Sequence, residues 1–207
     1  MQWHDIDQNT EEWLDLRPGK LTGSAVGKVM ANYGKAFGDP AKKLASIIAC
    51  EQVTGRRNQI ESYSNDHTER GHMQEPLARK LYEDTYFVDV TNGGFYDLGN
   101  LGFSPDGRVS HDGLIEIKSV IIPVHCATIK RGDIDPAYKW QACFNLAYSD
   151  REWIDFVSYC DDFPIETRLF VKRVTRDDIA EEVKMMDQRI SEFFELVESE
   201  KRIIRGM

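Results

Sequence analysis

The sequence lacks the features that mark membrane-spanning and secreted proteins. No stretch approaches the run of about 18 apolar residues that a membrane-spanning helix needs. The first residues, Met1 to Asp5, do not form the basic-then-apolar pattern of a signal peptide. We therefore expect a protein that does not enter a membrane and that stays in the cytoplasm.

Cysteine is also scarce. The four cysteines lie far apart and form no Cys-x-x-Cys pair, and none has a histidine at metal-ligand spacing. They are Cys50, Cys126, Cys143 and Cys160. This pattern favours free thiols in a reducing compartment over disulfides, with a zinc site as the weaker alternative.

Positive charge is in deficit. The chain has 26 basic and 35 acidic residues and a net charge of −9, which excludes a histone-like protein that holds nucleic acid by its overall charge. Nine of the acidic residues and only two basic ones fall between Asp177 and Glu200. The rest of the chain is therefore nearly neutral and leaves room for a local basic groove.

The 207 residues, 41% of them hydrophobic, suffice for one well-packed core. No repeat, low-complexity tract or linker divides the chain, so we expect a single domain, 1–207. Apolar periodicity predicts helices over 10–16, 22–31, 40–54 and 136–148. It also predicts a helix that has Met73, Leu77 and Leu81 on one face and ends before Val88. It further predicts a final helix that opens at Thr175 and runs through Val197. It predicts a polar loop over 55–66, a three-stranded meander over 88–120, and strands over 153–160 and 167–174. This order favours an α/β fold with a mixed central sheet flanked by helices.

One segment of the meander carries a cluster of charged residues. Side chains alternate along a strand, so Glu116 and Lys118 share one face while Ile115 and Ile117 point into the core. A turn near Asp112 would place Asp106 opposite Glu116, within about one residue. Adjacent carboxylates repel, and a hard cation such as Mg²⁺ stabilises them, so the cluster is typical of a site that cleaves phosphodiesters. The alternative is an ordinary surface hairpin with an exposed Glu116–Lys118 ion pair.

Asp106 followed by Glu116 and Lys118 is the Pro-Asp…(Asp/Glu)-x-Lys pattern of restriction-endonuclease-like nucleases. Three further segments resemble the phage lambda exonuclease and YqaJ-type viral recombinase family. They are Trp13 to Ser24, similar to Trp-x-x-x-Arg-x-Gly-x-x-Thr-(Ala/Gly)-Ser; Arg70 to Ala78, similar to a Gly-x-x-x-Glu helix; and Tyr138 to Ala142, similar to the start of a Gln-x-Gln helix. The four segments follow the family's order over most of the chain. Cys143 replaces the second Gln, so the role of that position in relatives is in doubt here.

The resemblance implies a restriction-endonuclease-like core and a Mg²⁺-dependent 5′→3′ exonuclease, with Mn²⁺ able to substitute. Such an enzyme degrades one strand of linear duplex DNA, forms a homotrimeric ring at double-stranded DNA ends, and works with a single-strand annealing protein in phage-type recombination in the bacterial host cytoplasm. The implied catalytic residues are Asp106, Glu116, Lys118, Glu75 and Gln141. The implied metal ligands are Asp106, Glu116, Ile117 and Glu75, and the implied pocket for a 5′-phosphate is formed by Arg17, Thr22, Ser24 and Ser104.

Each supporting residue also has a structural interpretation. Glu75 is a carboxylate near a helix start, Gln141 is a helix residue open to solvent, and Thr22 or Ser24 could cap a helix while Arg17 pairs with Asp15. Basic residues that could line a DNA channel, or be ordinary surface, are Lys28, Lys35, Lys42, Lys43, Arg56, Arg57, Lys130 and Arg131. The competing functions are a sequence- or structure-specific endonuclease of the same superfold and a non-catalytic protein that binds DNA ends.

Overall fold

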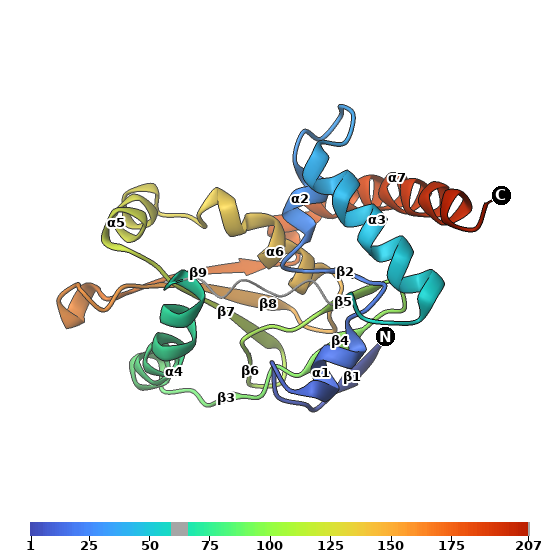
Figure 1. Cartoon of the computed structure of the whole chain (residues 1–207). Helices are drawn as coiled ribbons and strands as arrows, with labels where there is room; N and C mark the ends of the chain where they lie inside the picture. The colour runs from blue at the N-terminus through green and yellow to red at the C-terminus, as the bar shows by residue number, and fades with distance from the viewer. Residues whose placement is uncertain (59–65, 207) are drawn as a thin grey trace.

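The chain forms two β-sheets, and the larger one has two long parallel strands at its centre. The structure is a computed structural model that describes residues 1–58 and 66–206. The larger sheet runs in the order β3-β6-β7-β8-β9 (Figure 1). Its strands are β3 Val90–Thr91, β6 Gly107–Val109, β7 Gly113–Ser119, β8 Trp153–Tyr159 and β9 Leu169–Thr175. Only the β7–β8 pair is parallel, so the sheet is mixed, as the sequence predicts.

The smaller sheet joins the N-terminal segment to the middle of the chain. It runs in the order β1-β4-β5-β2. Its strands are β1 Gln2–His4, β2 Leu21–Thr22, β4 Phe95–Asp97 and β5 Leu101–Phe103. β2 lies parallel to β5 with Thr22 opposite Gly102, and the other pairs are antiparallel.

The predicted three-stranded meander is therefore wrong in detail. Residues 88–120 form five strands, and these divide between the two sheets. Gly94 and Gly99, which lie between consecutive strands of this segment, have positive φ angles of 66° and 76°. The partners of β4 and β5 include β1 and β2, which lie near the N-terminus. Local periodicity carries no information about such distant pairing.

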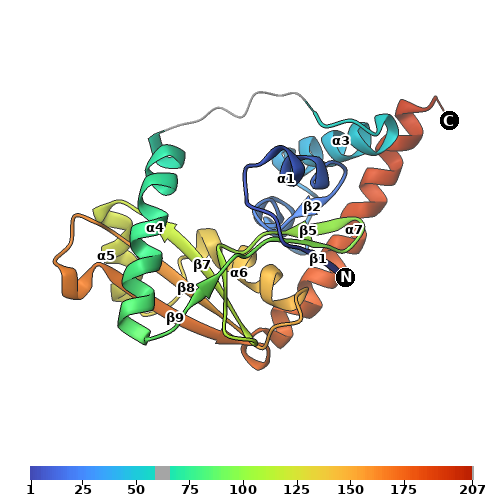
Figure 2. The same ribbon diagram turned by 90° about the horizontal axis from the view of Figure 1, so that it is seen from below.

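The helices lie on both faces of the larger sheet (Figure 2). They are α1 Glu11–Leu16, α2 Val26–Met30, α3 Asp39–Thr54, α4 Asp66–Tyr86, α5 Ile122–Arg131, α6 Pro136–Ala147 and α7 Ala180–Ile204, with short 3₁₀ helices η1 Ile165–Thr167 and η2 Asp177–Ile179. One core cluster lies between the sheet and α6, α7, α2 and α3 and contains Leu114, Phe144, Phe156 and Phe193. A second cluster lies under α4 and contains Tyr82, Ile115 and Ile117. Strand β7 is therefore buried on both of its faces, as is typical of a central strand.

The apolar face of α4 differs from the predicted one. Met73 and Leu77 are 76% and 54% exposed, whereas Ala78 and Tyr82 are buried against the sheet. The buried face is thus shifted by one residue, because the small Ala78 allows α4 to approach β7. The helix does end before Val88, as predicted.

Other local predictions are confirmed. Asp135 caps α6 with its carboxylate on the Ala137 N–H at 2.9 Å, and Pro136 follows at the first helical position. The Thr175–Asp178 contact also forms, since the Asp178 carboxylate accepts from the Thr175 N–H at 2.8 Å. The predicted start of the final helix at Thr175 is wrong, however, because Thr175 ends β9 and α7 begins at Ala180. Helix α5 was not among the predicted elements, and most of the loop expected over 55–66 lies outside the described residues.

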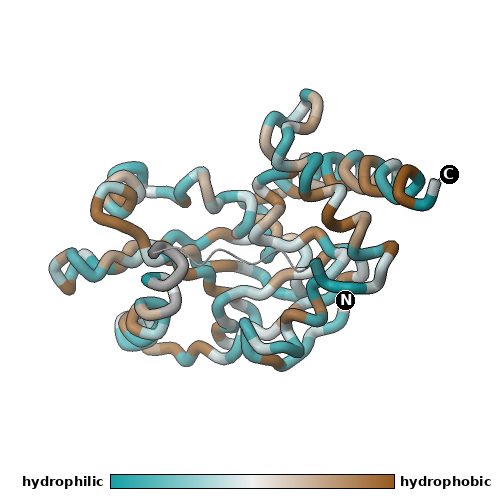
Figure 3. Tube along the Cα trace, in the orientation of Figure 1, coloured by the Kyte–Doolittle hydropathy of each residue, from teal (hydrophilic) through white to brown (hydrophobic). Residues whose placement is uncertain are grey.

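Within the described residues, no helix has both the length and the apolar character needed to cross a membrane. The longest helix, α7, alternates hydrophilic and hydrophobic residues along its length (Figure 3). Its buried residues Met186, Ile190, Phe193 and Val197 recur at helical spacing. The acidic side chains of this segment occupy the remaining faces.

Candidate active site

The β6–β7 hairpin places Asp106 opposite Glu116. Gly107 pairs with Ile115, so the next pair outward is Asp106 with Glu116. The Asp106 N–H donates to the Ile115 carbonyl oxygen at 3.0 Å, and the Ile117 N–H donates to Asp106 Oδ2 at 2.6 Å. The predicted register is confirmed, and Asp106 is held by the strand that carries Glu116.

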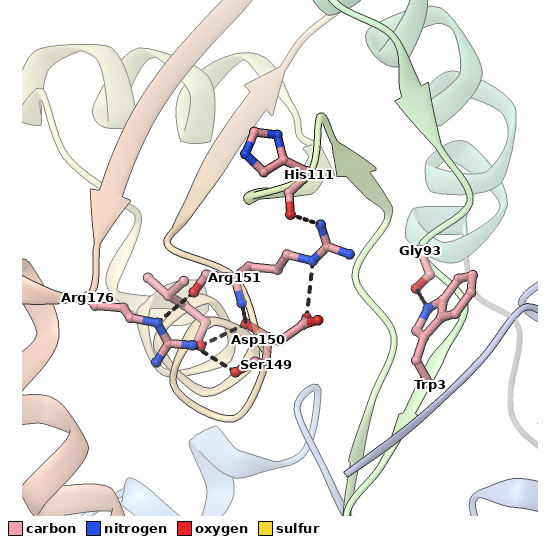
Figure 4. A network of polar contacts seen from close by, with 8 residues as sticks. Trp3, Gly93, His111, Ser149, Asp150, Arg151 and Arg176 are labelled. Atoms are coloured by element: carbon pink, nitrogen blue, oxygen red, sulfur yellow. Dashed lines mark hydrogen bonds and ion pairs between the residues drawn. The ribbon is translucent and has the colours of Figure 1, made fainter.

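The turn of this hairpin is fixed by two arginines (Figure 4). The buried Arg151 donates to the carbonyl oxygen of His111 and lies 3.1 Å from Asp150 Oδ1. Arg176 in turn donates to the carbonyl oxygens of Arg151 and Ser149, each at 2.7 Å. The two guanidinium groups thus connect the hairpin turn to the start of β8 and the end of β9. These contacts help to hold the strands that carry Asp106 and Glu116 in place.

Glu116 lies in a nest of side-chain donors. It is 1% exposed, so the exposed ion pair considered from the sequence is not formed. Glu116 Oε1 accepts from Lys118 Nζ and from Gln141 Nε2, each at 2.6 Å. Glu116 Oε2 accepts from Asn145 Nδ2 at 2.9 Å. Three side chains from β7 and α6 therefore orient one carboxylate, as expected of a functional group rather than of a surface residue.

Helix α4 brings Glu75 to the same place. Glu75 Oε1 lies 3.6 Å from Arg79 Nη2, one turn further along α4. Arg79 also donates to the carbonyl oxygen of Asp106. Gln74 next to Glu75 is hydrogen-bonded by the Ser119 hydroxyl at the end of β7. The structure therefore places Glu75 beside the hairpin that carries Asp106 and Glu116, as predicted.

Burial raises the pKa values of all three carboxylates, and a neighbouring carboxylate adds to the shift of two of them. Burial, followed by repulsion from Asp106, raises the pKa of Glu116 to about 8. Burial and Asp106 also raise the pKa of Glu75 to about 7. Burial likewise raises the pKa of Asp106, against the opposing effects of Lys118 and the Ile117 N–H. The negative charge of this cluster exceeds what its own cations neutralise.

The pKa of Lys118 is also raised, which in a cationic group favours the charged form. Burial disfavours its charge, but the nearby carboxylates of Glu116 and Asp106 outweigh burial and raise the pKa of Lys118 above its ordinary value. Its Nζ also lies 5.4 Å from the centre of the Tyr138 ring. In this setting Lys118 carries a proton at neutral pH, which suits it to donate hydrogen bonds to a water or a phosphate oxygen.

The residues present suit a hard divalent cation. Among the described residues, no three His, Cys, Asp or Glu side chains form a ready-made metal cage. Mg²⁺, however, takes few carboxylates and completes its shell with waters and substrate oxygens. Burial and the nearby Asp106 carboxylate raise the pKa values of Glu75 and Glu116, and a bound cation would offset both effects. Ile117 can contribute only its backbone, which already contacts Asp106.

The loop that carries Asp106 is held from several directions. Gln8 Nε2 donates to the Pro105 carbonyl oxygen at 3.1 Å. A Cβ on Gly93 would overlap that same oxygen, so only glycine allows the approach. Trp3 Nε1 in turn donates to the Gly93 carbonyl oxygen at 2.9 Å (Figure 4).

A cavity of about 340 Å³ opens beside this loop. Glu75, Arg79 and Asp106 are among the residues that line it. Its remaining lining residues are Asp7, Gln8, Asn9, Pro76 and Asn92. Glu75 and Asp106 thus border a polar space that is open to a substrate.

The four residues assigned to the 5′-phosphate pocket lie around the start of this loop. The Arg17 guanidinium stacks 3.9 Å over the Trp13 ring, and Trp13 Nε1 donates to Ser104 Oγ at 2.7 Å. Thr22 Oγ1 lies 3.4 Å from Ser24 Oγ. The pairing of β2 with β5 brings Thr22 beside Gly102, two residues before Ser104.

The structural alternatives for these residues are not realised. Helix α2 has Ala25 at its N-cap and no side-chain cap, so neither Thr22 nor Ser24 caps it. In the part of the chain that the structure describes, Arg17 makes no ion pair with Asp15; its charged neighbour is Glu51.

Cys143 does not take the place of a second glutamine in the site. It is 1% exposed and packs in the core on the opposite side of α6 from Gln141. Burial raises the pKa of its thiol to about 12, so it is an unreactive core residue. All four cysteines are free, as expected.

Sequence reasoning missed three residues of the site. Gln8, Arg79 and Asn145 contact Pro105, Asp106 and Glu116 respectively. Arg79 and Asn145 follow Glu75 and Gln141 by four residues, so helical periodicity was a usable signal for both. Nothing in the local sequence points to Gln8.

Comparison with known proteins agrees with this geometry. Residues 12–152 match the YqaJ-like viral recombinase domain. The structure is similar to that of an alkaline exonuclease (LHK-Exo) from Laribacter hongkongensis, with a TM-score of 0.78 and 33% identity over 95% of this chain and 99% of that one. The same exonuclease in complex with dAMP matches equally well. A phage related exonuclease from Haemophilus somnus 129PT shares the fold, with a TM-score of 0.67 and 18% identity over 91% of this chain and 96% of that one.

No curated protein matches the sequence. The expected restriction-endonuclease-like α/β fold is nevertheless confirmed by the structural match. The family match and the alkaline exonuclease together support a nuclease, and more narrowly an exonuclease related to recombination.

Proposed function

Because the chain belongs to the YqaJ-like viral recombinase family, we propose that it is a Mg²⁺-dependent 5′→3′ exonuclease that degrades one strand of linear double-stranded DNA in recombination by single-strand annealing. The observation that carries the proposal is the buried Glu116, which faces Asp106 across the hairpin and accepts from Lys118 at 2.6 Å. Burying a cluster of charged groups costs free energy, so its presence favours a functional role over a purely structural one.

Asp106, Glu116 and Glu75, with the backbone carbonyl of Ile117, would hold Mg²⁺, and Mn²⁺ would substitute for it. When bound, the cation supplies positive charge that stabilises the negative charge developing on the scissile phosphate. The Lys118 ammonium orients the attacking water or a phosphate oxygen by donation. The Gln141 amide, already on Glu116 Oε1, supplies a neutral donor at the same point.

The proposed polarity rests on the Arg17 side of the site. A terminal 5′-phosphate carries more charge than an internal diester, and the Arg17 guanidinium with the hydroxyls of Thr22, Ser24 and Ser104 supplies matching donors. Ser104 lies two residues before Asp106, so a phosphate held there would leave the next bonds of the strand near the carboxylates. The dAMP complex of the similar alkaline exonuclease supports a nucleotide product.

We further propose a homotrimeric ring around the DNA. Three copies of a modest basic surface would explain how a chain of net charge −9 holds duplex DNA. Lys28 and Lys43 line one cavity of about 760 Å³ along α3. Lys43, Arg56 and Arg57 line another of about 430 Å³ beside it. Light scattering should give about three times the chain mass of 23.8 kDa, and a monomer mass would contradict the ring.

In the cell, the partner would be a single-strand annealing protein in the cytoplasm of the bacterial host. The exonuclease exposes a 3′-ended strand, which such a protein would coat. Co-purification of this chain with a single-strand annealing protein produced in the same cells would support the pairing.

The decisive experiment compares linear and covalently closed circular duplex DNA, each with Mg²⁺ or with EDTA. We expect the linear DNA to be degraded only when Mg²⁺ is present, and the closed circular DNA to remain intact in both conditions. Cleavage of the closed circle would favour the endonuclease. Stable binding to DNA ends without cleavage of either form would favour the non-catalytic end binder.

A further inference from the structure

Asn145 is a fully buried side chain of α6 that contacts Glu116 of the candidate active site. Its Nδ2 donates to Glu116 Oε2 at 2.9 Å. The other oxygen of Glu116 accepts from Lys118 and Gln141. Asn145 is therefore the side chain that fixes the second oxygen of this carboxylate. The amide orientation follows from chemistry, because an amide oxygen facing a carboxylate would place two acceptors together.

The opposite end of the amide points to the Thr22–Ser24 turn. In the described part of the chain, Asn145 Oδ1 is buried and accepts no hydrogen bond. A Cβ added to Gly23 would overlap this oxygen, while its next contacts, Phe103 Cβ at 3.2 Å and Phe144 Cδ1 at 3.4 Å, are tight but not prohibitive. The bare Cα of Gly23 is what admits the Asn145 side chain. A buried acceptor without a donor costs free energy, so packing alone does not explain an asparagine here.

We propose that Asn145 is a positioning residue that joins the Thr22–Ser24 turn to Glu116. One rigid amide contacts both the carboxylate assigned to the cation and the backbone between the two hydroxyls assigned to the terminal phosphate. It sets the separation between the two parts of the site, so that a terminal phosphate and the bond to be cut keep a fixed spacing. The inference rests on the proposed function for the roles of the two parts, but the contact itself does not.

The first test is a double-mutant cycle in thermal stability, without metal or DNA. Gly23→Ala alone should lower the melting temperature strongly, because the new methyl group overlaps Asn145 Oδ1. Asn145→Ala removes that atom, so Gly23→Ala should cost much less in the Asn145→Ala background. Additive effects of the two substitutions would overturn the inferred contact.

The second test separates positioning from packing. Asn145→Leu keeps the buried volume but removes the donor to Glu116. It should weaken Mn²⁺ binding, measured by calorimetry, by about 10-fold or more. It should also lower the ratio of degradation rates on 5′-phosphorylated and 5′-hydroxyl ends. The matched control is Cys143→Ala on the same helix, equally buried but facing the core, which should lose stability and change neither quantity.

If Asn145→Leu, like Cys143→Ala, changes neither Mn²⁺ binding nor the ratio of rates on the two end types, the inference is wrong. Asn145 is then a packing residue. If the leucine variant does not fold, Asn145→Ala, which also removes the donor to Glu116, gives the same readouts. A wild-type protein that cleaves no DNA would instead refute the proposed function. The stability cycle and Mn²⁺ binding would still decide the role of Asn145 in that case.

Discussion

Arg79 donates to the backbone carbonyl oxygen of Asp106 while its guanidinium lies 3.6 Å from Glu75. A single side chain of α4 thus holds the loop of one candidate metal ligand and neutralises another. Helix α4 itself is anchored where the Tyr82 hydroxyl donates to the buried Asp155 at 2.6 Å. The position of Glu75 therefore depends on contacts with β8 as well as with β7.

Arg79→Gln should reduce cleavage by about 10- to 100-fold at saturating Mg²⁺, because the Asp106 loop loses a donor and Glu75 loses its counter-charge. The activity of Arg79→Lys should fall between those of Arg79→Gln and wild type, because lysine keeps the charge but lacks the planar guanidinium with its several donors. Lys80→Gln is the matched control, because Lys80 is exposed on the same helix and pairs with Asp84. Equal activity of the Arg79→Gln and Lys80→Gln proteins would show that Arg79 has no influence on the site.

Asp106→Asn and Glu116→Gln should each abolish cleavage of linear duplex. DNA binding should survive or improve, since negative charge facing phosphate is removed. Cleavage assays with Mg²⁺ and with Mn²⁺, together with a gel-shift assay, measure both properties. The controls are Asp89→Asn and Glu152→Gln at exposed positions. Substantial cleavage by either active-site variant would remove that residue from the site.

Lys118→Ala should lower kcat by about 10²- to 10³-fold with little change in KM, as expected of a group that acts mainly on the transition state. Lys184→Ala on the exposed surface of α7 is the control. Single-turnover rates and DNA affinity should be measured on the same preparations. A loss of affinity alone would make Lys118 a phosphate contact.

The metal-free protein should become less stable as the pH rises from about 4.5 to about 8. The folded state raises the pKa of Glu75 to about 7 and that of Glu116 to about 8, so it binds more protons than the unfolded chain in this range. Melting temperatures in EDTA across this range measure the slope, and Glu116→Gln should flatten it while Glu152→Gln should not. Added Mg²⁺ should stabilise the protein most at the upper end. A slope that Glu116→Gln leaves unchanged would mean that other groups cause it.

Arg17→Ala should abolish the preference for 5′-phosphorylated over 5′-hydroxyl ends and slow digestion, while Mn²⁺ binding remains. The informative quantity is the ratio of rates on the two end types, compared with wild type and with Arg202→Ala on α7. A wild-type ratio near one would remove the physical support for the proposed 5′→3′ polarity. An unchanged ratio in the variant would make Arg17 a structural partner of Trp13.

The sequence alone determined the parts of this protein that depend on short-range periodicity. Asp106 and Glu116 are ten residues apart on two strands joined by a tight turn, so alternation and turn residues sufficed to place them opposite one another. The cap of α6 at Asp135 and the pairing of Thr175 with Asp178 are equally local. Glu75, Gln141 and the Arg17 segment came instead from resemblance to a family, and their convergence with the hairpin is a property of the fold.

Tertiary structure alone decided which side chains support that hairpin. Gln8 reaches Pro105 across 97 positions of sequence, and Asn145 reaches Glu116 across 29. The division of residues 88–120 between two sheets likewise depends on β1 and β2, which come from the N-terminus. Periodicity reports which face of an element is apolar, but it does not report which distant element covers that face. A buried polar contact depends on that second choice, because its partner is selected by packing in three dimensions.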